Sequence, residues 1–183
     1  MEFKEFEKIP RLSREMFITE KIDGTNGCIG IDALTGEFLV GSRSRWITPE
    51  NDNFGFAKWA YAHKDELVAG LGHGVHYGEW WGSGIQRGYG LPKGEKRFSL
   101  FNVSRWLDDA VRPACCHVVP LLYQGVFDMD VIKSELHKLD ALGSRASEGF
   151  KPAEGIVIYH VAANMYFKKT ILHDESPKGL VEK

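Results

Sequence analysis

The stretch Glu20-Lys21-Ile22-Asp23-Gly24-Thr25-Asn26 joins an apolar run at Met16–Glu20 to a second run that begins at Cys28. Asp-Gly and Thr-Asn pairs favour turns, so the pattern predicts a strand, a turn and another strand. Lys21 would then be exposed at a defined point just before the turn. A lysine becomes a nucleophile when burial or neighbouring cations lower its pKa. On these few letters alone, an ordinary solvated turn lysine is an equally good interpretation.

Outward from this stretch, the chain alternates between short strand patterns and two helical patterns. A hairpin turning at residues 34–37 is expected within residues 28–45, with further strands at 73–81, 97–103, 155–160 and 164–172 and an apolar stretch at 118–127. Helices are expected at 51–70 and 130–142, the second with Asp128 or Asp130 as N-cap and Gly143 after its last turn. Many strands joined by hairpins, with two longer helices, indicate an α+β domain.

Length and composition indicate one ordinary globular domain. The chain has 183 residues, 43% of them hydrophobic and 26% charged, which excludes a disordered or fibrous protein. A formal net charge of −2 gives no global basic field of the kind that marks many nucleic-acid binders. Three cysteines without metal spacing, a charged N-terminus without an apolar segment and no apolar run of ~20 residues favour a cytoplasmic protein without disulfides or membrane spans.

Two arginines lie at the end of the expected hairpin. Arg43 and Arg45 are two residues apart at the end of a predicted strand, and such side chains share a face. Two guanidinium groups on one face form a clamp for a phosphate or a ribose. A pair of exposed edge cations is the alternative.

Two glutamates lie in apolar strand patterns. Glu79 is flanked by Gly78 and Trp80, and Glu154 opens the run 155–158. A buried carboxylate is costly without a partner, so a ribose hydroxyl or a metal-bound water is expected beside it, with a structural pair of Glu79 and Arg43 or Arg45 as the alternative. Close to these strands, Phe98 and Phe101 could stack on a purine or belong to the core.

The last apolar strand ends in two lysines, Lys168 and Lys169. Carboxylates and lysines on neighbouring strands fit a site for a metal-bound nucleoside triphosphate.

Taken in order, these segments resemble the six motifs of the covalent nucleotidyltransferase superfamily of ATP-dependent ligases and mRNA capping enzymes. The matching segments are Lys21–Asn26, Ser42–Arg45, Tyr77–Gly82, Arg97–Val103, Glu154–Ile158 and the basic Phe167–Thr170. The form Glu-Lys-Ile-Asp-Gly-Thr-Asn and the Gly-x-Gly-Ile-Gln sequence at 82–86 are most similar to nick-sealing RNA ligases. Two motifs depart from the pattern: Phe101-Asn102 stands for Phe-Asp, and Lys168-Lys169-Thr170 for Lys-x-Lys.

The resemblance implies a fold and a reaction. The fold is an ATP-grasp-like nucleotidyltransferase core of antiparallel sheets flanked by helices, a single minimal domain over residues 1–183 without a C-terminal OB domain. Lys21 would form lysyl-AMP from ATP, and the AMP would pass to a 5′-phosphate end that is then sealed to a 3′-hydroxyl. Lys168, with Lys169 as the alternative, would contact the α-phosphate, and Asp23 would help to organise the site.

The resemblance also implies residues for ATP and for Mg²⁺ or Mn²⁺. The metal would be held by Glu154. The nucleotide would be bound by Glu79 and Arg43 or Arg45 at the ribose, by Phe101 stacked on adenine, by Glu20 and the backbone beside it at the adenine edge and by Asn26 in the turn.

The expected partner is nicked or broken RNA, or else DNA ends. Arg87, Lys93, Lys96 and Arg97 are candidate contacts to its backbone, with a solvated loop as the alternative. Because only about a dozen residues follow Lys169, a partner protein could supply a nucleic-acid clamp. A DNA ligase, a capping-type guanylyltransferase and a nucleotide-binding remnant of a ligase remain open at this point.

Overall fold

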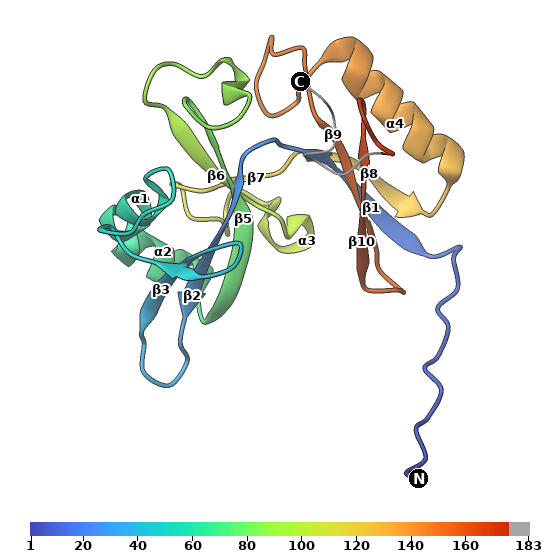
Figure 1. Cartoon of the computed structure of the whole chain (residues 1–183), viewed down its shortest axis with the longest axis horizontal. Coiled ribbons are helices and arrows are strands. Elements are labelled where there is room, and N and C mark those ends of the chain that lie inside the picture. The colour runs from blue at the N-terminus through green and yellow to red at the C-terminus, as the bar shows by residue number, and fades with distance from the viewer. Residues whose placement is uncertain (176–183) are drawn as a thin grey trace.

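The computed structural model describes residues 1–175 and contains two β-sheets with helices on their outer sides (Figure 1). The six-stranded sheet has the order β4 (Trp46–Ile47), β3 (Phe38–Ser42), β2 (Thr25–Ile31), β5 (Gly74–Gly82), β6 (Lys96–Leu100) and β7 (His117–Val118). The four-stranded sheet has the order β10 (Met165–Thr170), β9 (Gly155–His160), β1 (Glu15–Lys21) and β8 (Leu121–Val126). All pairs are antiparallel except β6 with β7. The expected α+β class is confirmed.

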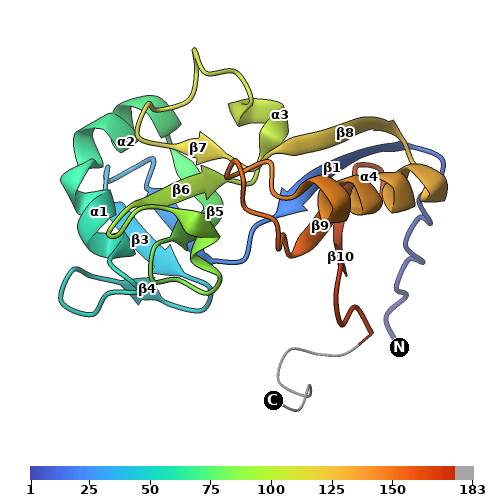
Figure 2. The same ribbon diagram turned by 90° about the horizontal axis from the view of Figure 1, so that it is seen from above.

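The helices are α1 (Phe56–Ala62), α2 (Lys64–Leu71), α3 (Val103–Trp106) and α4 (Met129–Leu142), with one 3₁₀ turn, η1 (Gly88–Gly90). Figures 1 and 2 place α1 and α2 against the larger sheet and α4 against the smaller one. Among the described residues, no helix is both long and apolar enough to cross a membrane.

Three apolar clusters hold these layers together. One lies between the larger sheet and α1 and α2 and includes Ile29, Phe56 and Phe98. A second packs Ile18 and Ile156 of the smaller sheet against α4. The third joins the inner faces of the two sheets and is here called the seam; its buried members are Ile22, Trp81, Tyr89, Val103 and Val119. The seam fixes how far apart the two inner faces lie.

The N-terminus of α4 is capped as the sequence predicts. Asp128 accepts hydrogen bonds from the backbone N–H groups of Asp130 and Val131, and Gly143 ends the helix with a φ of 92°. The side chain satisfies two of the donors that a helix start leaves open. Of the two candidate caps, Asp128 is therefore the correct one.

The single helix expected at residues 51–70 is wrong. Asp52 accepts bonds from the backbone N–H groups of Ala57 and Lys58, which delays the helix start to Phe56. At His63 the chain breaks into two helices, with φ −107° and ψ 16° at this residue. The His63 ring nitrogen bonds the Trp59 carbonyl at 2.8 Å, so a side chain takes part in the junction. Hydrogen bonds of this kind, between side chains and the backbone, do not alter the spacing of apolar residues, so the sequence pattern did not reveal the break.

The strand expected at residues 97–103 ends at Leu100. Asn102 turns the chain because its side-chain oxygen accepts a hydrogen bond from the Arg105 N–H and so caps α3. Val103 belongs to this short helix rather than to the strand.

Gly155 allows β9 and β10 to approach closely. A Cβ at this position would collide with the carbonyl oxygen of Lys169 and lie 2.7 Å from the Cα of Thr170. We expect Gly155→Ala to lower the free energy of unfolding by about 3 kcal/mol, because backbone atoms cannot rotate away from the clash.

Gly149→Ala is the matched control for this substitution. Gly149 has a φ of +79° but nothing within 4 Å of the added carbon, so the cost is about 1 kcal/mol of backbone strain. Urea unfolding of both variants measures the difference, and equal losses would contradict the packing argument.

Candidate active site

Lys21 is the last residue of β1, at the point where the chain leaves the smaller sheet for the larger one. The register pairs Lys21 with Gly155 of β9, which brings the preceding Glu154 to the same corner. The Lys21 ammonium donates to Glu154 Oε2 at 2.6 Å, and the two side chains are 21% and 2% exposed. A buried carboxylate beside a partly exposed amine is the centre of the candidate site.

Glu79 lies across the seam, on the inner face of the larger sheet. Its two oxygens accept hydrogen bonds from the Gly24 backbone N–H at 3.0 Å and from the Asn26 amide at 3.1 Å. Asn26 is also its partner in the β2–β5 register. The carboxylate therefore braces the turn that follows Lys21.

Burial dominates the charge state of Glu79. Loss of hydration raises the pKa of this carboxyl to about 7, against the lowering effects of Lys21 and the Gly24 N–H. Glu154 and Asp23 raise it further by like-charge repulsion. Perturbed carboxyls of this kind gather at functional sites.

Asp23 is hydrogen-bonded to the loop that contains Arg87 and Tyr89, and the sequence did not predict this contact. Arg87 donates to Asp23 Oδ2 at 3.0 Å and to the carbonyls of Pro152 and Ala153, directly before Glu154. The Asp23 backbone N–H donates to the Tyr89 hydroxyl at 2.8 Å. Arg87 thus links the turn after Lys21 to the entry of β9.

Arg87 is exposed as expected but already holds these bonds within the chain, and its contact to nucleic acid stays a prediction. Two of the other candidates are also engaged within the chain: Lys96 donates to the Phe54 carbonyl, and Arg97 bonds Glu95 and lies over the Trp81 ring. Lys93 is exposed.

Glu20 faces away from Lys21, because neighbouring residues on a strand point to opposite sides. Its carboxylate accepts hydrogen bonds from the Ser144 hydroxyl and from the backbone N–H groups of Arg145 and Ala146. Burial raises its pKa, and these bonds oppose the rise. In this structure the side chain anchors the loop after α4, so reading of the adenine edge stays a prediction for the Glu20 backbone alone.

The two lysines of β10 lie on opposite faces of the smaller sheet. Lys168 pairs with Val157, which pairs with Thr19, and this row shares the face of Lys21. Lys169 pairs with buried Ile156 on the α4 face and forms an ion pair with Asp174 at 2.8 Å. Only Lys168 therefore projects to the side of the candidate site.

Phe101 and the arginine pair differ in how well they match expectation. Phe101 is half-buried in the seam, whereas Phe98 is fully buried core. Arg43 and Arg45 lie in the turn between β3 and β4 instead of on one strand face. The shared-face premise is wrong because Ser42 and Arg45 close a hairpin, with the Ser42 N–H bonded to the Arg45 carbonyl. Arg45 bonds Asn51, and Arg43 is exposed.

The donor set fits a metal that is shared with a phosphate ligand. No group of three or more His, Cys, Asp and Glu side chains forms a protein-only cage within residues 1–175. Mg²⁺ is often held by one or two carboxylates together with substrate phosphates and water. Glu154, beside a cationic amine, is such a carboxylate.

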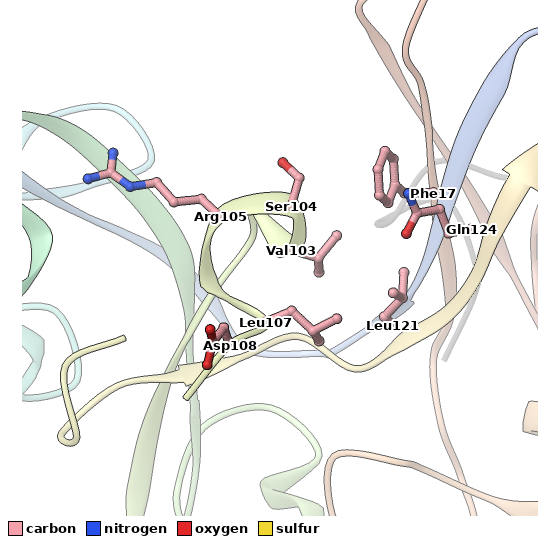
Figure 3. A pocket seen from close by; sticks show the side chains of 8 residues that line it. All are labelled: Phe17, Val103, Ser104, Arg105, Leu107, Asp108, Leu121 and Gln124. Carbon is pink, nitrogen blue, oxygen red and sulfur yellow. The ribbon is translucent and has the colours of Figure 1, made fainter. Parts of the chain in front are cut away.

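A cavity of about 480 Å³ opens beside the seam, between α3 and the strands β1 and β8 (Figure 3). Phe17, Val103 and Leu121 supply apolar walls, and Ser104, Asp108 and Gln124 supply polar groups. Its lining does not include Lys21, Glu79 or Glu154. Sequence reasoning missed this cavity because its walls come from three separate segments.

The profile of the RNA ligase family matches residues 14–171. The chain belongs to this family, and the expected membership of the covalent nucleotidyltransferases is confirmed. No curated protein matches the chain closely enough to count as a relative.

Solved structures with the same fold include an RNA ligase from Naegleria gruberi. Its structure with pyrophosphate has a TM-score of 0.64 and 19% identity, over 86% of this chain and 50% of that one. Mutants of that ligase with AMP and Mn (TM-score 0.62, 19% identity) and with ATP and Mn (0.61, 18%) cover 87% and 86% of this chain and 50% of theirs. This chain thus spans about half the length of the ligase it matches.

The raised pKa of Glu79 makes stability depend on pH. The folded chain keeps a proton on Glu79 between its ordinary pKa of 4.5 and about 7, while the unfolded chain releases it. This stabilisation is present below pH 4.5 and is lost as the pH rises through 7. We expect Glu79→Gln to remove this pH-dependent loss of stability. Between pH 5 and pH 8, the free energy of unfolding of the variant should therefore rise by up to ~3 kcal/mol relative to that of wild type.

Urea unfolding across that range measures the two profiles. Glu37→Gln, at an exposed position in the turn before β3, is the control and should follow wild type. Parallel profiles for Glu79→Gln and wild type would refute the assigned pKa.

Proposed function

We propose that this chain is the nucleotidyltransferase core of an ATP-dependent RNA ligase that forms lysyl-AMP on Lys21. The observation that carries the proposal is the Lys21–Glu154 pair, 2.6 Å apart, at the corner where both sheets meet. Membership of the RNA ligase family and the likeness to a ligase solved with ATP, AMP and pyrophosphate support it.

In the first step, Lys21 Nζ attacks the α-phosphorus of ATP. A P–N bond forms, the P–O bond to the β-phosphate breaks, and pyrophosphate leaves. The attacking amine must be neutral. Glu154 Oε2 lies within hydrogen-bond distance of Nζ and holds the amine in place, and the ammonium releases its proton to solvent before the attack.

The surrounding residues bind and orient the nucleotide. Lys168 shares the face of Lys21 and would neutralise charge on the α-phosphate. Glu79, with a pKa near 7, can accept from or donate to ribose hydroxyls. Half-buried Phe101 offers a ring for the base. Asp23 acts through Arg87, because their ion pair fixes the turn after Lys21.

Glu154 would also hold Mg²⁺ or Mn²⁺ when nucleotide is bound. The ligase from Naegleria gruberi was solved with Mn together with ATP or AMP. Bound there, the metal supplies positive charge that offsets the phosphate oxygens. The metal would then replace the Lys21 ammonium as the positive charge beside Glu154.

In the later steps, AMP passes from Lys21 to the 5′-phosphate of an RNA end. The 3′-hydroxyl of the other end then attacks that phosphate, a phosphodiester bond forms and AMP leaves. We assign the adenylation chemistry to residues 1–183. Because the chain spans half of the ligase it matches, a partner protein or further domain that clamps the ends is part of the proposal for sealing.

The first test is covalent labelling. We expect Mg²⁺ and α-labelled ATP to label the chain, and Lys21→Ala to abolish the label because no other side chain replaces the amine. Labelling by GTP in place of ATP would favour a guanylyltransferase. No label from either nucleotide would favour a nucleotide-binding remnant, and both outcomes contradict the proposal. Nicked duplexes with RNA or DNA at the 3′-hydroxyl then separate an RNA ligase from a DNA ligase.

The second test separates the two lysines of β10. Lys168→Ala should slow labelling by roughly 100-fold, in the range seen when a group stabilising the transition state is removed. Lys169→Ala is the matched control and should label within about threefold of wild type, because Lys169 faces α4 and pairs with Asp174. The opposite ranking would overturn the assignment made from the register.

A further inference from the structure

An aromatic row crosses the inner face of the smaller sheet. Phe17 of β1 is the register partner of Tyr159 of β9, and Tyr159 is the partner of Tyr166 of β10. Directly paired residues of antiparallel strands point to the same side of the sheet. The three rings therefore belong to one surface, here called the aromatic row.

The rings of Tyr159 and Tyr166 form a pair near the edge of the sheet, half-buried at Tyr159 and exposed at Tyr166. The Tyr159 and Tyr166 ring centroids lie 4.5 Å apart with an interplanar angle of 31°. Tyr166 is 63% exposed although it lies in a regular strand. The Tyr159 hydroxyl donates to Asn164 at 2.7 Å, which orients its ring. Exposed and oriented rings of this size indicate a binding surface.

The aromatic row lies next to the candidate active site on the same face. Strand residues two apart share a face, so Tyr166 lies beside Lys168, and Phe17 lies two such steps from Lys21. At about 3.3 Å per residue, the row is roughly 7 Å from the Lys168 position along β10. At its other end, Phe17 also lines the cavity beneath α3 (Figure 3).

We propose that the aromatic row is a base-stacking platform for single-stranded RNA beside the adenylation site. Aromatic side chains stack on any base, so they bind a strand without reading its sequence. A chain of net charge −2 has little general attraction for phosphates, and stacking supplies affinity that does not depend on that charge. Lys168, one step along the strand, adds a local cation for the backbone.

The proposal deepens the proposed function, on which it rests, by naming how the RNA end is held. It predicts that the bases of the substrate, in addition to its phosphates, contribute to binding. It also predicts that the opposite face of β10 contributes nothing. Phe167 is the matched control there, since it is 49% exposed on the same strand but points to the α4 side.

The test measures binding of fluorescently labelled single-stranded RNA, 5′-phosphorylated and about ten nucleotides long, by anisotropy at fixed low salt. An abasic oligomer of the same length and charge is the second probe. Wild type should bind the base-containing RNA about tenfold more tightly than the abasic one. The double variant Tyr159→Ala with Tyr166→Ala should lose this preference. If the double variant is unstable, the single variant Tyr166→Ala should lose most of it.

Tyr159→Phe with Tyr166→Phe keeps the rings and should keep the preference, as should Phe167→Ala. Self-labelling with ATP should be unchanged in every variant. The proposal is overturned if the alanine variants retain the preference, if Phe167→Ala loses it equally, or if wild type shows none. Wild type that prefers bases but does not label with ATP would instead contradict the proposed function alone.

Discussion

The register of β1 against β9 is the constraint on which the rest of the site depends. By pairing Lys21 with Gly155, it sets the amine beside the Glu154 carboxylate. The same register, carried across to β10, decides which side chains share that face. A slip of one residue would turn every one of them to the α4 side. Gly155 protects the register, because its missing Cβ is what lets β10 approach.

The second organising feature is an excess of buried carboxylates around few cations. Asp23, Glu79 and Glu154 influence one another, and burial together with this repulsion raises the pKa of Glu79. Lys21 and Arg87 offset only part of the negative charge. The chain keeps an arrangement that costs stability, which is expected where the groups are arranged for chemistry rather than for folding.

The sequence singles out the principal residues of the candidate site because each has a distinctive local setting. Lys21 precedes a turn, and Glu79 lies inside an apolar strand. By contrast, the helix break at His63 depends on side-chain bonds that apolar spacing does not register. Arg87 contacts Asp23 across 64 residues of sequence, so no local pattern reveals that pair. The fold class followed from the periodicity of apolar residues. The seam between the sheets could not be predicted in this way, because its residues come from segments far apart in the sequence.

The hydrogen bonds of Arg87 also bear on how the two sheets can move. One guanidinium group binds Asp23 in the turn after Lys21 and the carbonyls that lead into β9, while Tyr89 in the same loop packs in the seam. These contacts tie the two sheets together near their common corner, so we expect the sheets to move as one body rather than about a hinge. Under the proposed function, entry and exit of the nucleotide would then depend on side chains and rim loops, whose rearrangements are faster than the swinging of whole domains.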